Sequence, residues 1–213
     1  MNLLRALAAV ALALSACHSN SVMVERPHNS TAVDHAISAR WAHEIQGNAR
    51  DGDWILTRSY AFMADGIVVA TGTGAETPMS HASIYSAEHG TVIEAIGGGV
   101  REIPLADLMQ RNHYAVVVRP AGMSEAAQHA AVVRARAQVG KPYDVGGIFG
   151  LDTADKFYCS ELVWWASDGD ARYGSETVIT PTEMLAHGEV VYWSGPRDDA
   201  QLTAAVTDAV AAR

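Results

Sequence analysis

Cysteine is scarce in this chain. Only Cys17 and Cys159 occur among its 213 residues, and Cys17 closes a short apolar stretch at the N-terminus. Once that stretch is removed as a leader, Cys159 is alone in the globular part and has no partner for an intramolecular disulfide. An unpaired thiol kept in an oxidising compartment points to catalysis rather than to structure. The alternative is a small buried hydrophobic residue.

Positive charge is also in deficit, because 15 Lys and Arg stand against 24 Asp and Glu and give a formal net charge of -9. An acidic body argues against nucleic acid and against electrostatic docking to anionic lipid. No Cys-x-x-Cys, His-x-His or His-Glu-x-x-His motif occurs, and Gly97-Gly98-Gly99 lacks the spacing of a phosphate or dinucleotide loop. We therefore expect no metal and no cofactor, and we expect these glycines to form a flexible wall beside Glu94.

Long apolar runs are missing too, and the one at the N-terminus, Leu7 to Leu14, is too short to span a bilayer. It ends in small residues before Cys17, which resembles a bacterial lipoprotein signal peptide. That resemblance implies cleavage of residues 1–16 and acyl chains on Cys17, which would anchor the protein stably to a membrane. Residues 17–31 are then the lipidated cysteine and a polar tether. The expected location is the bacterial cell envelope, facing the periplasm.

Residues 32–213 have the length of one domain, whose core we place at about 49–193. Apolar spacing predicts helices over 32–49, 104–111 and 124–139, another from Cys159 onward and a short terminal one in 198–213. It predicts strands over 54–56, 66–70, 82–85, 91–96 and 114–119, with a hairpin turn at Glu88-His89-Gly90. The mixed order favours an α+β fold over a regular βαβ alternation.

A candidate catalytic group centres on Cys159, which stands where an apolar helix begins, so that the helix dipole favours its thiolate. Among nine histidines, His81 differs because it opens a buried-looking strand rather than a polar stretch. Alternation along the predicted hairpin makes Glu94 face either His81 or Ser83, and both registers put the carboxylate on the side of His81. Glu94 could then orient the imidazole. The alternatives are a hydrogen-bonded core histidine and a solvated Glu94.

Five segments together resemble the permuted papain-like amidases of the YaeF/YiiX type, which are relatives of the NlpC-type cell-wall peptidases. They are Gly52-Asp53-Trp54-Ile55, Ser80-His81-Ala82-Ser83-Ile84-Tyr85, Val92-Ile93-Glu94-Ala95, Gly140-Lys141-Pro142-Tyr143-Asp144 and Tyr158-Cys159-Ser160-Glu161-Leu162-Val163. His81 precedes Cys159, as in the permuted branch. The resemblance implies a small antiparallel sheet packed against helices, with the cysteine at a helix N-terminus.

The same resemblance assigns a role to each matching residue. Cys159 would be the nucleophile, His81 the base and Glu94 the residue that orients it. Tyr143 matches a tyrosine whose hydroxyl lies near the oxyanion in the relatives, and the backbone N–H of Cys159 would be the second donor. The alternative for Tyr143 is a packed aromatic residue at a loop corner.

The sequence thus predicts a cell-envelope cysteine hydrolase with a Cys-His-Glu triad that cleaves an amide bond, for example in peptidoglycan peptides, through an acyl-enzyme on Cys159. Two other functions stay open. The same triad serves a lipid or ester acyl hydrolase or an acyltransferase, which an apolar slot by Trp164, Trp165 or Phe149 would favour. A non-catalytic envelope binding module is the third. The expected partners are an amide or acyl substrate and the membrane, and the oligomeric state is left open.

Overall fold

The computed structural model describes residues 32–60, 77–151, 153–168 and 178–197. The signal peptide and lipidated tether expected over 1–31, the strand expected over 66–70 and the terminal helix expected over 198–213 lie outside these residues. Within the described part of the chain, no helix combines the length and the apolar character needed to cross a membrane.

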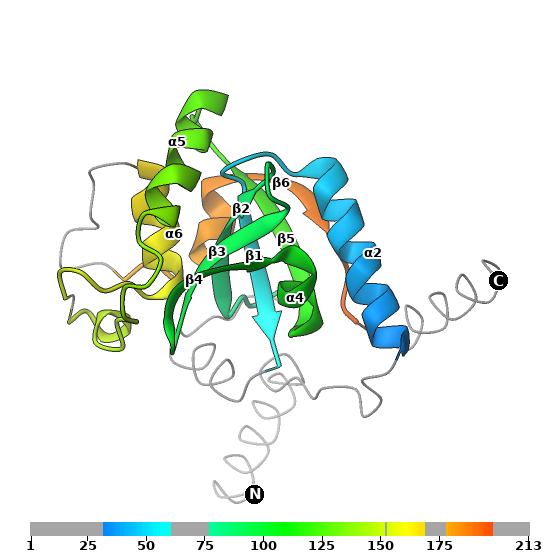
Figure 1. Cartoon of the computed structure of the whole chain (residues 1–213), viewed down its shortest axis with the longest axis horizontal. Coiled ribbons are helices and arrows are strands. Elements are labelled where there is room, and N and C mark those ends of the chain that lie inside the picture. Colours follow the sequence, from blue (N-terminus) through cyan, green and yellow to red (C-terminus); the bar gives the residue numbers. More distant parts are fainter. Residues whose placement is uncertain (1–31, 61–76, 152, 169–177, 198–213) are drawn as a thin grey trace, which may run out of the picture.

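A six-stranded antiparallel sheet forms the centre of the molecule, with the strand order β4-β3-β2-β1-β5-β6 (Figure 1). Its strands are β1 (Trp54–Ser59), β2 (His81–Ser86), β3 (Thr91–Ile96), β4 (Gly99–Pro104), β5 (Asn112–Pro120) and β6 (Gly188–Trp193). The strands expected at 54–56, 82–85, 91–96 and 114–119 are confirmed. The two outermost strands, β4 and β6, were not predicted.

Helices cover both faces of this sheet, so the fold is α+β, as predicted. In Figure 1, α5 (Glu125–Arg136) and α6 (Cys159–Asp168) lie to the left of the sheet, and α2 (Ala32–Asn48) and α4 (Leu105–Gln110) to its right. Two short 3-10 helices, η1 (Gly147–Phe149) and η2 (Glu183–His187), complete the described elements. The predicted Ser124 cap of α5 accepts a hydrogen bond from the N–H of Ala127. The helix ends at Arg136 rather than Val139, because residues 137–140 form turns.

Strand alternation divides the core into two layers. Trp54 and Leu56 of β1 belong to the cluster that includes α5 and α6, and Ile55 between them belongs to the cluster that includes α2 and α4. Helix α2 buries Ile37, Trp41 and Ile45, which recur every four residues on one face. Because each face of the sheet packs on helices, the edge of the sheet where β2 begins lies between the layer of α5 and α6 and the layer of α2 and α4. We call this edge the rim. That rim carries the candidate site.

Candidate active site

The free thiol of Cys159 stands at the first residue of α6, as predicted, and only 4% of the residue is exposed. The helix is fixed against the sheet by Leu162, Val163 and Ala166, all fully buried in the core cluster. Glu161 accepts a hydrogen bond of 3.1 Å from the N–H of Tyr158 and so occupies one free donor of the first turn. Cys159 is therefore anchored at the positive end of a helix whose orientation the core sets.

The His81 ring bridges two acidic groups at the start of β2. Its Nε2 lies 2.6 Å from Oε2 of Glu94, and the ring also shares a hydrogen bond with the thiol of Cys159. Since Nε2 is used by Glu94, the nitrogen that serves Cys159 is Nδ1. Burial lowers the pKa of His81, but the hydrogen bonds to Cys159 and Glu94 and their charges outweigh burial and raise this pKa to about 9. The site therefore favours an imidazolium.

The pKa of the Cys159 thiol is lowered, whereas that of His81 is raised. Burial raises the pKa of the thiol, but the hydrogen bond and the charge of His81, together with the backbone N–H groups of Ala82 and Ser160, bring the pKa below its ordinary value. The contact with Ala82 places the sulfur beside the first residues of β2. The geometry thus favours a thiolate paired with an imidazolium, which is the reactive form of a nucleophilic cysteine.

Glu94 is completely buried and receives hydrogen bonds from three positively charged side chains. Besides His81, Arg101 donates from Nε at 2.9 Å to Oε1, and Arg111 donates from Nη2 at 2.8 Å to Oε1 and 2.9 Å to Oε2. Burial raises the pKa of Glu94, but His81 and Arg111 lower it far more, so the carboxylate stays ionised. The strand register pairs Ser83 with Glu94, which is one of the two registers predicted. A solvated Glu94 is wrong.

Tyr143 lies in the loop between α5 and α6, close enough to Cys159 for the charge of the thiolate to act on it. Two parts of this loop are joined where Tyr143 forms a single parallel bridge with Phe157, which is buried in the core cluster. Burial, and then the negative charge of Cys159, raise the pKa of Tyr143 well above its ordinary value, so the phenol keeps its proton. A protonated hydroxyl next to the thiolate can donate a hydrogen bond to a developing oxyanion.

The glycines beside Glu94, which were expected to form a flexible wall, lie in a turn and at the start of a strand. Gly97 and Gly98 form the turn between β3 and β4, and Gly99 begins β4 opposite Ile96. Gly99 has φ of 106°, and a Cβ there would lie 2.5 Å from the carbonyl oxygen of Lys141. This close approach lets Val100 donate to the same carbonyl at 2.8 Å. Glycine therefore fixes the loop that carries Tyr143 onto β4.

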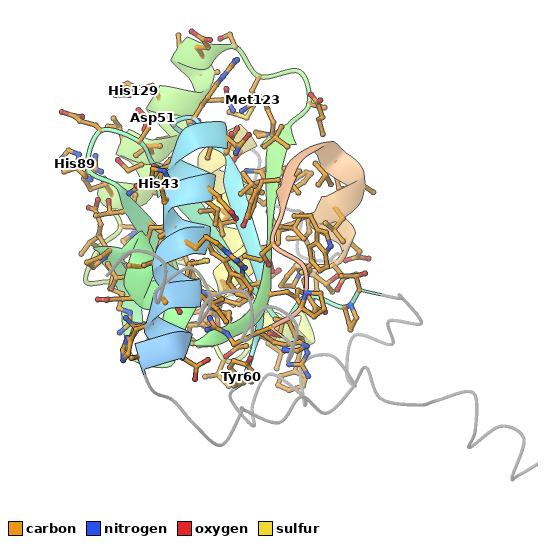
Figure 2. The ribbon with its side chains drawn as sticks, turned by 90° about the vertical axis from the view of Figure 1, so that its right-hand side faces the viewer. His43, Asp51, Tyr60, His89, Met123 and His129 are labelled. Carbon is orange, nitrogen blue, oxygen red and sulfur yellow. The ribbon has the colours of Figure 1, made fainter. Side chains whose placement is uncertain are left out.

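His89 and His129 lie far from the start of β2. Figure 2 shows Asp51, His89 and His129 at one end of the molecule and Tyr60 at the other. Tyr60 follows β1 at the end where His81 pairs with Thr57 and β2 begins. His129 is half-exposed and pairs with Asp51 at 2.9 Å. Among the described residues, no three His, Cys, Asp or Glu side chains are grouped so that they could hold a metal ion.

The structure thus brings Cys159, His81, Glu94 and Tyr143 together, and sequence patterns missed Arg101 and Arg111. Arg101 is paired with Glu94 across β3 and β4, so a prediction of β4 would have found it. Arg111 is the C-cap of α4. Nothing in the sequence at the end of this helix indicates that Arg111 contacts a carboxylate on another element.

Comparison with known proteins identifies the family. Residues 48–190 match the profile of the permuted papain-like amidase enzymes of the YaeF/YiiX type, the C92 family. The match spans more than half of the chain and includes all four predicted catalytic residues. No curated protein matches the chain.

Proposed function

The chain belongs to the permuted papain-like amidase family, and on that premise we propose that it is a cysteine hydrolase that cleaves an amide bond through an acyl-enzyme on Cys159. The observation that carries the proposal is the continuous set of contacts from the thiol of Cys159 through the His81 ring to the buried carboxylate of Glu94. A metal-independent nucleophile needs this set: a thiolate, a proton carrier and a fixed counter-charge.

In the first half of the reaction, the Cys159 thiolate attacks the amide carbonyl carbon, a C–S bond forms and the carbonyl electron pair moves to oxygen. The phenol of Tyr143 and the backbone N–H of Cys159 stabilise this oxyanion. When the intermediate collapses, the C–N bond breaks and His81 gives its proton to the leaving amine. Glu94 keeps its charge throughout and holds the ring in place.

In the second half, neutral His81 takes a proton from water, and the hydroxide attacks the thioester carbonyl. The C–S bond breaks, a carboxylic acid leaves, and the thiolate and imidazolium of the resting site are restored. Ester and thioester substrates use the same steps with a different leaving group.

Turnover by variants tests the roles. Cys159→Ala and His81→Ala should each reduce amide hydrolysis to background with an unchanged unfolding transition, measured by mass spectrometry of products released from purified peptidoglycan and from an amide and a thioester probe. His129→Ala is the matched control, since it removes an exposed histidine paired with Asp51. If the wild-type protein cleaves neither probe nor peptidoglycan, the proposal fails and a binding module takes its place.

We further propose that the protein is held in the cell envelope by acyl chains on Cys17, which makes peptidoglycan peptides the nearest amide substrate. The support is the sequence alone: a short apolar stretch with small residues before Cys17. Cys17→Ser should stop incorporation of labelled palmitate and release the protein from membranes, with the activity of the body unchanged. Wild-type protein that takes up no palmitate would remove the anchor from the proposal.

A second candidate is an acyl ester or lipid substrate whose chain would extend along α6 from Cys159 into a cavity of about 340 Å³ beside the later turns of that helix. Trp54 and Trp164 line it with ring centroids 5.7 Å apart, together with Met123. Ser167 and His187 give it a polar side as well. If the cavity binds an acyl chain, Trp164→Ala should raise KM for a long-chain thioester and leave a short-chain one unchanged, whereas equal effects would exclude this candidate.

A further inference from the structure

The environment of Glu94 carries more positive charge than one carboxylate needs. Arg101 and Arg111 both contact it, and either guanidinium alone would neutralise it. The pair Cys159 and His81 contributes no net charge, whether it is thiolate and imidazolium or thiol and imidazole. Glu94, Arg101, Arg111 and the catalytic pair together therefore keep one positive charge.

Both guanidiniums also reach solvent, with 42% of the Arg101 side chain and 38% of the Arg111 side chain exposed. A guanidinium has five N–H donors, so each keeps donors beyond those given to Glu94. In Arg111, Nε is buried and has no hydrogen-bond partner in the described part of the chain. Two half-exposed guanidiniums with spare donors are suited to bind a carboxylate or phosphate oxygen.

The excess charge lies on the histidine side of the site. His81 Nε2 and Arg111 Nη2 bond the same oxygen of Glu94, at 2.6 and 2.9 Å, so these nitrogens are no further apart than the two bonds combined. The charges that act on Tyr143, by contrast, are negative and include those of Asp144 and Glu161. The excess positive charge therefore lies along the Nε2 edge of the His81 ring, whose other nitrogen serves Cys159.

We propose that Arg101 and Arg111 form a carboxylate-binding subsite on the leaving-group side of the scissile bond, so that the substrate releases an amine that bears a carboxylate, as an amino acid or a peptide does. The inference rests on the proposed function, because His81 marks the leaving-group side only if it protonates the leaving amine. It selects peptide substrates over lipid amides, whose leaving groups lack this charge.

A matched pair of alkylating reagents tests the subsite without a known substrate. N-bromoacetylglycine and N-bromoacetylglycinamide both alkylate a thiol with loss of bromide. They differ only in a terminal carboxylate, which lies one bond further from the attacked carbon than the carboxylate of a leaving amino acid. The full-length protein is labelled with each reagent, and the rate of labelling of Cys159 by the anionic reagent is divided by the rate with the neutral one. This ratio is then divided by the same ratio for N-acetylcysteinamide, which corrects for the intrinsic reactivity of the two reagents. We expect a corrected preference of about tenfold for the anionic reagent.

Variants assign this preference to the arginines. Arg101→Gln and Arg111→Gln should each reduce the preference severalfold, while Arg101→Lys should keep part of it because the charge remains. Arg136→Gln is the control, since Arg136 donates to Glu102, a carboxylate of β4 adjacent in sequence to Arg101, and strand alternation points Glu102 to the other face. The ratio cancels any change in thiolate reactivity that a variant causes.

The outcomes of the labelling experiment distinguish a failure of the subsite from a failure of the proposed function. Rapid labelling by the neutral reagent with no anionic preference would overturn the subsite and leave the cysteine hydrolase standing. Equal slowing of both reagents in Arg101→Gln, with the preference intact, would show that Arg101 acts only through Glu94 and would also overturn the subsite. Failure of both reagents to label Cys159 would overturn the proposed function and the subsite with it.

Discussion

Replacing Glu94 by Gln tests how the site makes its thiolate. The substitution keeps the shape of the side chain but removes the charge that faces His81 at 2.6 Å. Arg101 and Arg111 then lose their carboxylate, and their charges act on the imidazolium without compensation. Because both guanidiniums reach solvent, we expect the variant to fold.

The magnitude follows from the pKa of His81. A value of about 9, against an ordinary value of 6.5, means that the site favours the imidazolium by about 3 kcal/mol. The hydrogen bond to Cys159 is the largest favourable cause and Glu94 is the next. If Glu94 supplies about half, its loss removes between about 1 and 2 kcal/mol and lowers the equilibrium constant between the ion pair and the neutral pair roughly tenfold.

The assay is the rate of Cys159 alkylation by iodoacetamide as a function of pH. In the wild type, the thiolate forms below the ordinary thiol pKa, because the pKa of Cys159 is lowered. The imidazolium is lost as pH rises through about 9, because the pKa of His81 is raised. The ion pair occupies the window between these two values.

In Glu94→Gln the first inflection should move up and the second should move down, so that the window narrows and the rate falls most on its acidic side, where the thiolate forms at higher pH than in the wild type. Glu102→Gln is the control, because Glu102 pairs with Arg136 rather than with His81. A folded Glu94→Gln protein in which both inflections stay at their wild-type positions would refute the reasoning.

Two further predictions concern stability, measured by denaturant unfolding. Arg119→Met leaves the fully buried Asp53 without its ion-pair partner at 2.9 Å and should lower the free energy of unfolding by about 3 to 5 kcal/mol, whereas Arg50→Gln, which breaks an exposed pair, should change it by less than about 1 kcal/mol. Equal effects would contradict this account. Gly99→Ala should lower the free energy of unfolding by about 2 kcal/mol, because Gly99 has a positive φ and the new Cβ would lie 2.5 Å from a carbonyl oxygen. Gly98→Ala is the control and should change the free energy of unfolding by about 0.5 kcal/mol or less, because no atom beyond its chain neighbours lies within 4 Å of its Cβ position. A neutral Gly99→Ala would show that the adjoining loop is not fixed.

Local patterns were sufficient for the hairpin that carries His81 and Glu94. A strand has a side-chain period of two, so any register set by the turn near Glu88 that preserves parity puts both residues on one face. The observed pairing of Ser83 with Glu94 is one of those registers. The period therefore determined the relation between the two side chains before any tertiary contact was considered.

The outer strands could not be predicted in this way. Strand β4 has the sequence Gly-Val-Arg-Glu-Ile-Pro, so it begins with a glycine, ends with a proline and carries two charges. Strand β6 is largely exposed and therefore lacks the alternation of buried and exposed residues on which the prediction depends. Each becomes a strand because a neighbour offers free backbone groups, β3 to β4 and β5 to β6. With β4 unassigned, Arg101 had no predicted place beside Glu94.

The contact between Cys159 and His81 depends on tertiary packing of a different kind. The two residues are 78 positions apart in the sequence. Cys159 belongs to α6, which packs on one face of the sheet. Glu94 lies on the other face, because strand alternation puts it on the same side as Val92, which packs in the layer of α2. The ring of His81 can serve both because it stands at the first position of β2, at the rim, where no further residue of that strand separates the layers. A histidine two residues further along would be enclosed on one face, as Ser83 is, and could not connect the thiol with the carboxylate. The strand boundary at His81 is therefore as much a part of the site as the imidazole itself.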